Sequence, residues 1–398
     1  MIKLIKFIVI AFLLLSFHDV SIGQWTTEKS PTANNLNSVF MVNENIGWIV
    51  GDKGTILYKV GDYWVNYNKI TNEDLYSVFM LDRNKGWAVG SKGTILSFNG
   101  ERWENQPCPT NRKLLSVYFN DSENGIAVGE NGTVLFYEND KWRMANKQIR
   151  GNLYTASGRG DSFIVGGGLE CVNIPVIRIL NDAARSQETL FDPHLEIRSI
   201  SFTEGGNIWA ASWPGGIFHF DGKEWKKIDF ENSIPALNSI CFSGENTGIS
   251  VGYSGTVMTY SVKGWERHDS PVKVKLNGAS VTGDTYYAVG NRGTIISWKE
   301  IVAENPGLEK PEPIKIEIYP NPAFERLNVI IPGDNGFIPD RILVSNVYGQ
   351  VVVNRRVDKG YSGEVYQINT SEFMDGLYFV KIYSSGKEEA SARFMVRH

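Results

Sequence analysis

The chain has 398 residues, enough for two or three domains, and its composition is ordinary except for 40 Gly, 11 Trp, 17 Tyr and 20 Phe. Its net charge of −4 offers no electrostatic reason for binding nucleic acid or an anionic membrane. Many glycines together with many aromatic side chains are typical of short strands joined by tight turns.

The N-terminus has the pattern of a secretory signal peptide. Lys3 and Lys6 form a basic start, residues 7–17 form an apolar run, and small residues at 21–23 mark a cleavage position. We expect the mature chain to begin at Gln24, so that residues 1–23 are removed. A membrane anchor is the alternative, but the apolar run is too short to span a bilayer comfortably. No later run is long and apolar enough, so we expect no transmembrane segment in the mature chain.

A unit of about 39 residues then recurs seven times between Trp25 and Trp298. Each copy reads as four short strands with the patterns Leu-x-Ser-Val-x-Phe, Gly-Trp-Ala-Val-Gly, Gly-Thr-Ile-Leu and a last strand that carries a Trp. The copies align on one small residue: Ser38, Ser77, Ser116, Thr155, Ser199, Ser239 and Gly278. A repeat of this length built only from short strands predicts an all-β fold, a seven-bladed β-propeller over residues 24–298.

The two ends of the repeat region complement each other. A lone Trp strand at Trp25 precedes the first repeat, and the last repeat stops after its third strand, near Trp298. We therefore expect Trp25 to lie on the outer strand of the last blade, which closes the ring. The strand with the small residue should be innermost, where blades crowd together. Repeat four lacks its Trp strand, and an insert at residues 181–191 lengthens the step to the next repeat.

One turn position varies strongly between repeats. The residue after each Val-Gly-type pair is Asp52, Ser91, Glu130, Gly167, Trp213, Tyr253 or Asn291. Symmetry should place these residues around one rim of the ring. A mixture of acids, amides and aromatic rings can hold a carbohydrate or a peptide, so the candidate binding residues are Asp52, Glu130, Trp213, Tyr253 and Asn291. The alternative is that they are turn residues under no functional demand.

The repeats show no catalytic set. Thr-Ile-Leu strands, not helices, follow the Gly-x-x-Gly turns, so these turns are not phosphate loops. Histidines are scattered without metal-ligand spacing, and we predict no metal site and no cofactor. Asp52 and Glu130 occupy equivalent turns two repeats apart, and a glycosidase needs two carboxylates that face one bond. We favour a non-catalytic binding protein; the alternative is a secreted glycoside hydrolase or lyase on a propeller scaffold.

The remainder of the chain forms a second unit. Residues 299–313 are polar and rich in proline, which indicates a linker. Residues 314–398 contain seven candidate strands, which favours a small Ig-like antiparallel β-sandwich. The candidate strands are residues 314–319, 326–331, 341–348, 351–357, 364–368, 377–383 and 390–396.

Both units resemble known families. The Gly-Trp-Ala-Val-Gly-x-x-Gly-Thr-Ile-Leu unit resembles the repeats of photosystem II assembly-factor propellers, which are distantly related to sialidase-type BNR repeats. This resemblance implies the fold and little about function. The C-terminal unit resembles the type A sorting domain of type IX secretion found in Bacteroidota, with an ordinary Ig-like binding module as the alternative. The residues that carry this second resemblance are Tyr319, Pro320, Asn321, Pro322, Gly349, Gly376, Leu377 and Tyr378.

The sorting-domain resemblance implies an address for the protein. It implies export by the signal peptide, passage across the outer membrane with the type IX machinery as partner, and a secreted or cell-surface location. The sorting domain is usually removed from such proteins. The ligand of the propeller remains an unknown glycan or protein.

Overall fold

The computed structural model describes residues 22–60, 63–145, 149–160, 162–168, 176–181, 187–190, 195–283, 285–301, 316–330, 339–347, 351–357, 365–384 and 387–398. These residues form 35 β-strands and five single 3₁₀ turns, so the described chain is all-β. None of its helical segments is long and apolar enough to cross a membrane.

Strands β1 to β28 form seven antiparallel four-stranded sheets within the described residues, and each sheet corresponds to one repeat. Sheet 1 contains β2 (Leu36–Asn43), β3 (Ile46–Gly51), β4 (Thr55–Val60) and β5 (Tyr63–Asn66). Sheet 2 contains β6 (Leu75–Met80), β7 (Gly86–Gly90), β8 (Ile95–Phe98) and β9 (Trp103–Asn105). Sheet 3 contains β10 (Leu114–Phe119), β11 (Gly125–Gly129), β12 (Val134–Glu138) and β13 (Lys141–Met144).

The remaining sheets follow the same order of strands. Sheet 4 contains β14 (Asn152–Arg159), β15 (Ser162–Gly168), β16 (Val176–Asn181) and β17 (Gln187–Leu190). Sheet 5 contains β18 (Glu196–Phe202), β19 (Ile208–Trp213), β20 (Gly216–Phe220) and β21 (Trp225–Lys227). Sheet 6 contains β22 (Leu237–Phe242), β23 (Gly248–Gly252), β24 (Val257–Ser261) and β25 (Gly264–His268). Sheet 7 contains β26 (Leu276–Thr282), β27 (Thr285–Gly290), β28 (Ile295–Ile301) and β1 (Ile22–Thr27).

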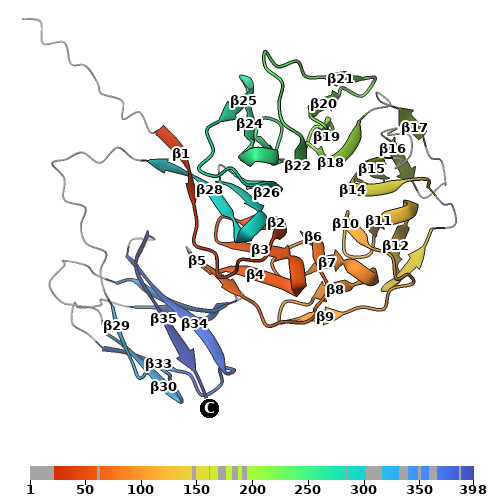
Figure 1. Ribbon diagram of the computed structural model, residues 1–398. Helices are drawn as coiled ribbons and strands as arrows, with labels where there is room; N and C mark the ends of the chain where they lie inside the picture. The colour runs from red at the N-terminus through yellow and green to blue at the C-terminus, as the bar shows by residue number, and fades with distance from the viewer. Residues whose placement is uncertain are drawn as a thin grey trace, which may run out of the picture.

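The sheets stand in a ring around an open centre (Figure 1). The first strands of neighbouring repeats contact one another all the way round, and β26 of the last sheet contacts β2 of the first. The strand with the small residue is therefore innermost, as the sequence predicts.

The N-terminal strand completes the last sheet. Strand β1 pairs antiparallel with β28, and Trp25 lies opposite Trp298. The Trp25 side chain is buried, and its ring contacts those of Trp298 and Tyr286 with centroids 5.8 and 6.3 Å away. The predicted closure by Trp25 is confirmed. The pairing also extends beyond the predicted limits of the propeller, because β1 begins at Ile22 and β28 ends at Ile301.

Sheet 4 differs from the sequence interpretation. The insert at residues 181–191 contains β17, which pairs with β16 and takes the place of the missing Trp strand. Strand pairing depends mainly on backbone hydrogen bonds, so a segment without the Trp can still form the fourth strand of the sheet.

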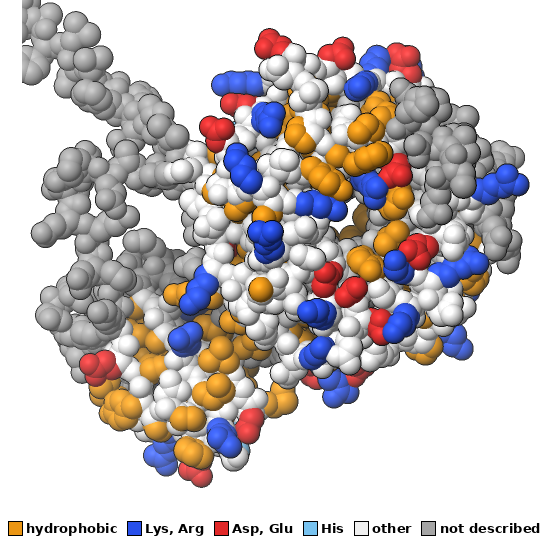
Figure 2. Space-filling model, viewed as in Figure 1, with side chains coloured by type: hydrophobic (Ala, Val, Ile, Leu, Met, Phe, Trp, Pro, Cys, Tyr) orange, Lys and Arg blue, Asp and Glu red, His pale blue; other side chains and the backbone are white. Residues whose placement is uncertain are grey.

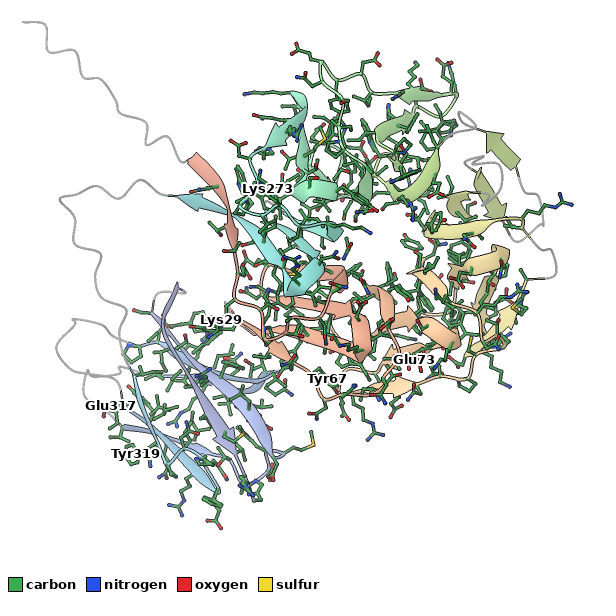
Figure 3. All side chains as sticks on the ribbon, viewed as in Figure 1. Lys29, Tyr67, Glu73, Lys273, Glu317 and Tyr319 are labelled. Carbon is green, nitrogen blue, oxygen red and sulfur yellow. The ribbon has the colours of Figure 1, made fainter. Side chains whose placement is uncertain are left out.

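Aromatic side chains fill the spaces between sheets. Trp48 of sheet 1 packs against Phe98 and Trp103 of sheet 2, with ring centroids 4.9 and 5.4 Å apart. Its ring also contacts Tyr67, on the segment that joins sheets 1 and 2 (Figure 3). The equivalent Trp87 of sheet 2 stacks on Phe119 of sheet 3, with the two rings nearly parallel. Each such pair adds about 0.5–1.5 kcal/mol beyond area burial, so the repeated Trp holds consecutive sheets together.

The small-residue column has a second role besides relieving crowding. The hydroxyl of Ser116 accepts a hydrogen bond of 3.0 Å from the backbone N–H of Ala156 in the next sheet. Similar bonds from the next sheet are accepted by the hydroxyls of Ser38, Ser77, Thr155 and Ser239. The Ser199 hydroxyl instead donates to the Ile240 carbonyl of the next sheet over 3.2 Å, and the last repeat has no hydroxyl here because it carries Gly278. A Cβ at this position would lie 2.9 Å from the Asn37 oxygen and the Ser38 Cα, so sheets 7 and 1 approach too closely for a side chain.

The C-terminal unit contains two further antiparallel sheets. One consists of β29 (Glu317–Tyr319), β30 (Arg326–Ile330) and β33 (Val365–Asn369). The other consists of β32 (Val351–Arg356), β31 (Arg341–Asn346), β34 (Gly376–Ser384) and β35 (Lys387–Val396). Side chains from both sheets, such as Leu327 and Val380, share one hydrophobic core. All seven candidate strands are present, with ends that differ by a few residues.

Some predicted features lie outside the described residues. These are most of the signal peptide, residues 302–313 of the linker, and Gly349 of the sorting motif.

Candidate binding site at the centre of the ring

The innermost strands share a local irregularity at the ring entrance. In every repeat the pairing of the first and second strands shifts register at the same place. The shift lies between the recurring Leu or Ile and the small residue two positions later, for example between Leu114 and Ser116. A bulge of this kind leaves the middle residue without a paired partner and redirects its side chain. The middle residues are Asn37, Tyr76, Leu115, Tyr154, Arg198, Asn238 and Asn277; we call them the inner ring.

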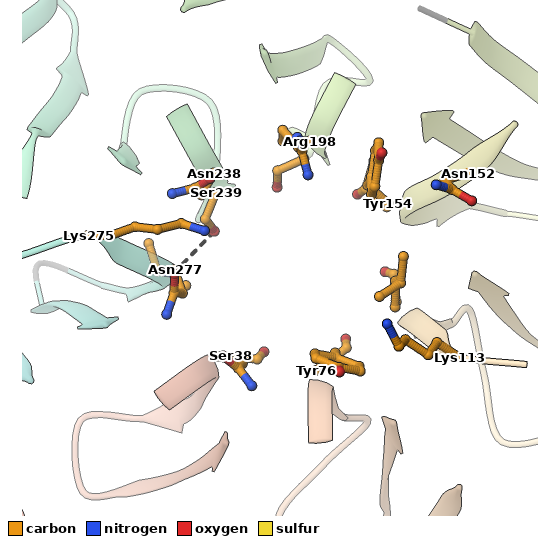
Figure 4. Close-up of a pocket in the computed structure, with 18 of the residues that line it drawn as sticks. Ser38, Tyr76, Lys113, Asn152, Tyr154, Arg198, Asn238, Ser239, Lys275 and Asn277 are labelled. Carbon is orange, nitrogen blue, oxygen red and sulfur yellow. Dashed lines mark hydrogen bonds between the residues drawn. The ribbon is translucent and has the colours of Figure 1, made fainter. Parts of the chain in front are cut away.

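The inner ring lines a cavity of about 460 Å³ at the centre of the sheets. Lys113, Asn152 and Lys275, each one residue before the Leu of its strand, also line it, together with Glu130. Figure 4 shows these side chains arranged around the opening, with Lys113 and Lys275 entering from opposite sides. The hollow is visible from outside in Figure 2. All inner-ring residues are half-buried, so they are accessible to a ligand and held by their neighbours.

The five binding residues proposed from the sequence stand beside this cavity. The backbone N–H of Asp52, Glu130, Tyr253 and Asn291 each donates to the carbonyl just before the innermost strand, over 2.8–3.1 Å. The repeat symmetry thus places them at equivalent points of one rim. Trp213 holds the corresponding point in sheet 5, opposite Glu196. Only Glu130 lines the cavity itself.

The rim residues support the inner ring. The Asp52 carboxylate accepts hydrogen bonds from the amides of Asn35 and Asn37, at 2.8 and 2.9 Å. Asn277 donates to the Asn291 side chain over 3.0 Å. The Tyr253 ring lies 5.0 Å from the Lys275 ammonium. Tyr253 and Trp213 are 39% and 38% exposed, so both rings can meet a ligand at the edge of the cavity.

The charged side chains of the cavity differ in their partners. Lys113 forms an ion pair of 2.9 Å with Glu130, whose hydrogen bond and charge raise the pKa of Lys113. Arg198 is paired with Glu196, and its guanidinium lies 4.2 Å from the centre of the Tyr154 ring. No carboxylate is paired with Lys275 among the residues that the structure describes.

The carboxylates Asp52 and Glu130 are each engaged within their own sheet. Asp52 is bonded to asparagines of sheet 1, and Glu130 to a lysine of sheet 3. Each carboxylate thus holds neighbouring side chains of its own sheet in place.

The variable inner-ring position was missed in the sequence analysis. Its signal was present in the x of the Leu-x-Ser pattern, which varies from Asn to Tyr, Leu and Arg while the residues on either side vary much less. The bulge that turns the x residue towards the axis cannot be read from the pattern alone.

At the other end of the chain, the sorting-motif residues join the first and last strands of the C-terminal unit. The Asn321 side chain accepts a hydrogen bond of 2.9 Å from the Met395 N–H, and Ala323 bonds to the same strand. Tyr378 is buried and donates to the Met374 carbonyl over 2.9 Å. Tyr319 is exposed at the end of β29 (Figure 3).

Residues 317–397 match the family model of the secretion system C-terminal sorting domain. The C-terminal unit is a type IX secretion sorting domain. A sorting domain of this family implies that the protein is handled by the secretion machinery and exported. A comparison with curated proteins found no matching relative.

Solved structures show what the repeat region is similar to. "YCF48 bound to D1 peptide" is 15% identical with a TM-score of 0.55, over 69% of this chain and 96% of that one. YCF48 from Cyanidioschyzon merolae is 16% identical with the same TM-score, over 69% and 98%. The WD40 β-propeller domain of Doa1 is 13% identical with a TM-score of 0.58, over 70% and 97%. The repeat region therefore has a propeller fold, and the predicted resemblance to photosystem II assembly factors is confirmed.

Proposed function

We propose that this protein is an exported, non-catalytic binding protein whose seven-bladed propeller holds a peptide segment at the central cavity. Residues 24–301 form the propeller and residues 302–313 the linker. Residues 314–398 form an Ig-like sorting sandwich. The signal peptide of residues 1–23 starts export, and the type IX machinery then delivers the protein to the cell surface or the medium.

One observation carries the proposal: the position between the recurring Leu or Ile and the small residue changes from repeat to repeat, and its side chains line the cavity. Packing between sheets accounts for the recurring Leu or Ile and the small residue, but it does not call for Tyr76, Leu115, Tyr154 and Arg198 in sheets 2 to 5. Aromatic and cationic side chains around an open, polar cavity suit a ligand with both apolar and polar groups.

A peptide is a better candidate than a glycan substrate. One structural neighbour of the propeller is a complex with a peptide. The single carboxylate among the described lining residues, Glu130, is held in an ion pair, whereas glycoside hydrolysis requires two carboxyl groups facing one bond. The described lining therefore supports binding better than glycoside hydrolysis.

Binding of the full chain to arrays of peptides and glycans tests this function. We expect peptides to bind, and the double change Tyr76→Ala and Tyr154→Ala to weaken them about tenfold or more, because each lost ring contributes roughly 1 kcal/mol of contact. Tyr63→Ala is the matched control, because Tyr63 is 63% exposed and lies on β5, the outermost strand of sheet 1. The proposal would be contradicted if the double variant bound peptides as tightly as the parent protein, or if the protein cleaved an array glycan.

A further inference from the structure

The charges of the cavity specify the ligand further. Three cationic side chains, Lys113, Arg198 and Lys275, line it together with one described carboxylate, Glu130. The lining thus carries a charge of +2, three minus one, on a chain whose net charge is −4. A local excess of one sign inside a concave wall concentrates ligands of the opposite sign.

The excess is concentrated on one side of the cavity. Lys113 is neutralised by Glu130 at 2.9 Å, so the side near sheet 3 has little charge to offer. Arg198 on β18 and Lys275 just before β26 flank sheet 6, and they have a single carboxylate, Glu196, between them. The residue of sheet 6 that corresponds to Lys275 is Ala236, which adds no charge of its own on this side.

Aromatic rings hold both cationic groups in position. The Arg198 guanidinium rests 4.2 Å from the Tyr154 ring centre, and the Lys275 ammonium rests 5.0 Å from that of Tyr253. A cation over an aromatic face keeps its N–H groups available for an anion. The Nε–H of Arg198 is buried and has no hydrogen-bond partner among the described residues, which is a costly state for a charged donor.

We infer that the ligand is an acidic peptide segment, with one of its carboxylates bound between Arg198 and Lys275 on the sheet 6 side of the cavity. This inference rests on the proposed peptide-binding function. A carboxylate suits the site because a guanidinium edge and an ammonium together provide several charge-assisted donors for its two oxygens. The peptide backbone would then run across Tyr154 towards Tyr76.

A matched pair of synthetic peptides tests the inference. An array peptide containing Asp or Glu is compared with a version in which every Asp is Asn and every Glu is Gln, using the full chain. We expect the acidic version to bind at least tenfold more tightly at low salt, and this advantage to shrink as NaCl is raised, because salt screens exposed charges.

Two lysine variants then locate the carboxylate. Lys275→Met should weaken the acidic peptide about tenfold and the neutral version less than twofold. This variant leaves no buried carboxylate unpaired, so folding should be preserved. Lys92→Met is the control, because Lys92 sits on the equivalent rim turn of sheet 2, 76% exposed, and is paired with Glu73 outside the cavity.

The possible results distinguish a failure of the acidic-ligand inference from a failure of the proposed peptide-binding function. Equal binding of the acidic and neutral versions, or an unchanged affinity in Lys275→Met, overturns the acidic ligand. If such neutral binding still depends on Tyr76 and Tyr154, the peptide-binding function stands. If neither version of any array peptide binds, both proposals fall.

Discussion

The same position of the repeat does different work in two parts of the ring. In sheets 6, 7 and 1, which we call the closing sector, it is an asparagine, and each amide donates to the carbonyl of the Leu that begins the next sheet. These bonds run from Asn238 to Leu276, from Asn277 to Leu36 and from Asn37 to Leu75, over 2.8–2.9 Å. In sheets 2 to 5, the open sector, the position holds Tyr76, Leu115, Tyr154 and Arg198.

The closing sector surrounds the place where the two ends of the repeat region meet. Sheets 7 and 1 come together only when β1 pairs with β28, across more than 270 residues of chain, so this junction bears a large loop-closure cost. Hydrogen bonds between sheets offset part of that cost. One variable position therefore reinforces the ring in one sector and presents side chains to the central cavity in the other.

The largest test of the closing sector is Trp25→Ala. Trp25 is 3% exposed and links β1 to the core between sheets 6 and 7. Its removal should lower the free energy of unfolding by about 3–5 kcal/mol. Trp225→Ala, in the fourth strand of sheet 5, is half-buried and should cost less than half as much. Denaturant unfolding measures both free energies. Equal losses would mean that the Trp of the closing strand β1 contributes no more to stability than the Trp of β21.

A second test introduces the usual residue of the small column where the closing sector lacks it. Gly278→Ser makes this repeat more like the others, yet it should destabilise by about 1–3 kcal/mol, because the new Cβ would lie 2.9 Å from backbone atoms of sheet 1. Ser280 already supplies the bond between sheets, accepting from the Met41 N–H over 3.0 Å. A stabilised Gly278→Ser protein would show that the two sheets can separate at no cost.

A reciprocal exchange tests the two sectors directly. Asn277→Leu should cost about 1–2 kcal/mol, because it removes two hydrogen bonds and leaves the Leu36 carbonyl without its side-chain donor. Leu115→Asn changes the same position in the open sector and should alter the free energy of unfolding by no more than about 0.5 kcal/mol. Comparable losses from the two changes, measured by thermal unfolding, would remove the distinction between sectors.

The smallest expected effect is a pH dependence at the junction of sheets 6 and 7. Burial lowers the pKa of His268, whose ring contacts Trp298 with centroids 5.1 Å apart and whose Nε2 is 2.6 Å from the Thr259 hydroxyl. The unfolded chain therefore binds a proton more readily than the folded one. Stability is complete above the ordinary pKa of about 6.5 and decreases as the pH falls below it.

His268→Gln isolates this contribution from that of His219, whose pKa burial also lowers. The variant should lose less stability than the parent between pH 7 and pH 5, as followed by denaturant midpoints. An identical decline in both proteins would assign the acid sensitivity to other groups.

Much of this architecture is readable from local patterns. The 39-residue period specifies the number of strands in each unit, and the unpaired Trp strand at Trp25 specifies how the ring closes. Closure follows from backbone hydrogen bonding, because the strand around Trp25 and the free edge of the last repeat can satisfy each other. The seven strands of the C-terminal unit can also be predicted from the sequence, because alternating apolar residues and turn signals act over short distances. The sorting-domain match over residues 317–397 likewise depends on local motifs.

The binding site is not readable in the same way. Lys113, Arg198 and Lys275 are separated by 85 and 77 residues in the sequence, and they converge only because the ring closes. Whether an inner residue points into the cavity depends on the bulge in its strand, and whether it bonds to the next sheet depends on the distance between sheets. The repeat, its closing strand and the sorting domain can thus be predicted from local sequence patterns. Which variable residues line the central cavity depends on the packing of all seven sheets, and it emerges only from the folded ring.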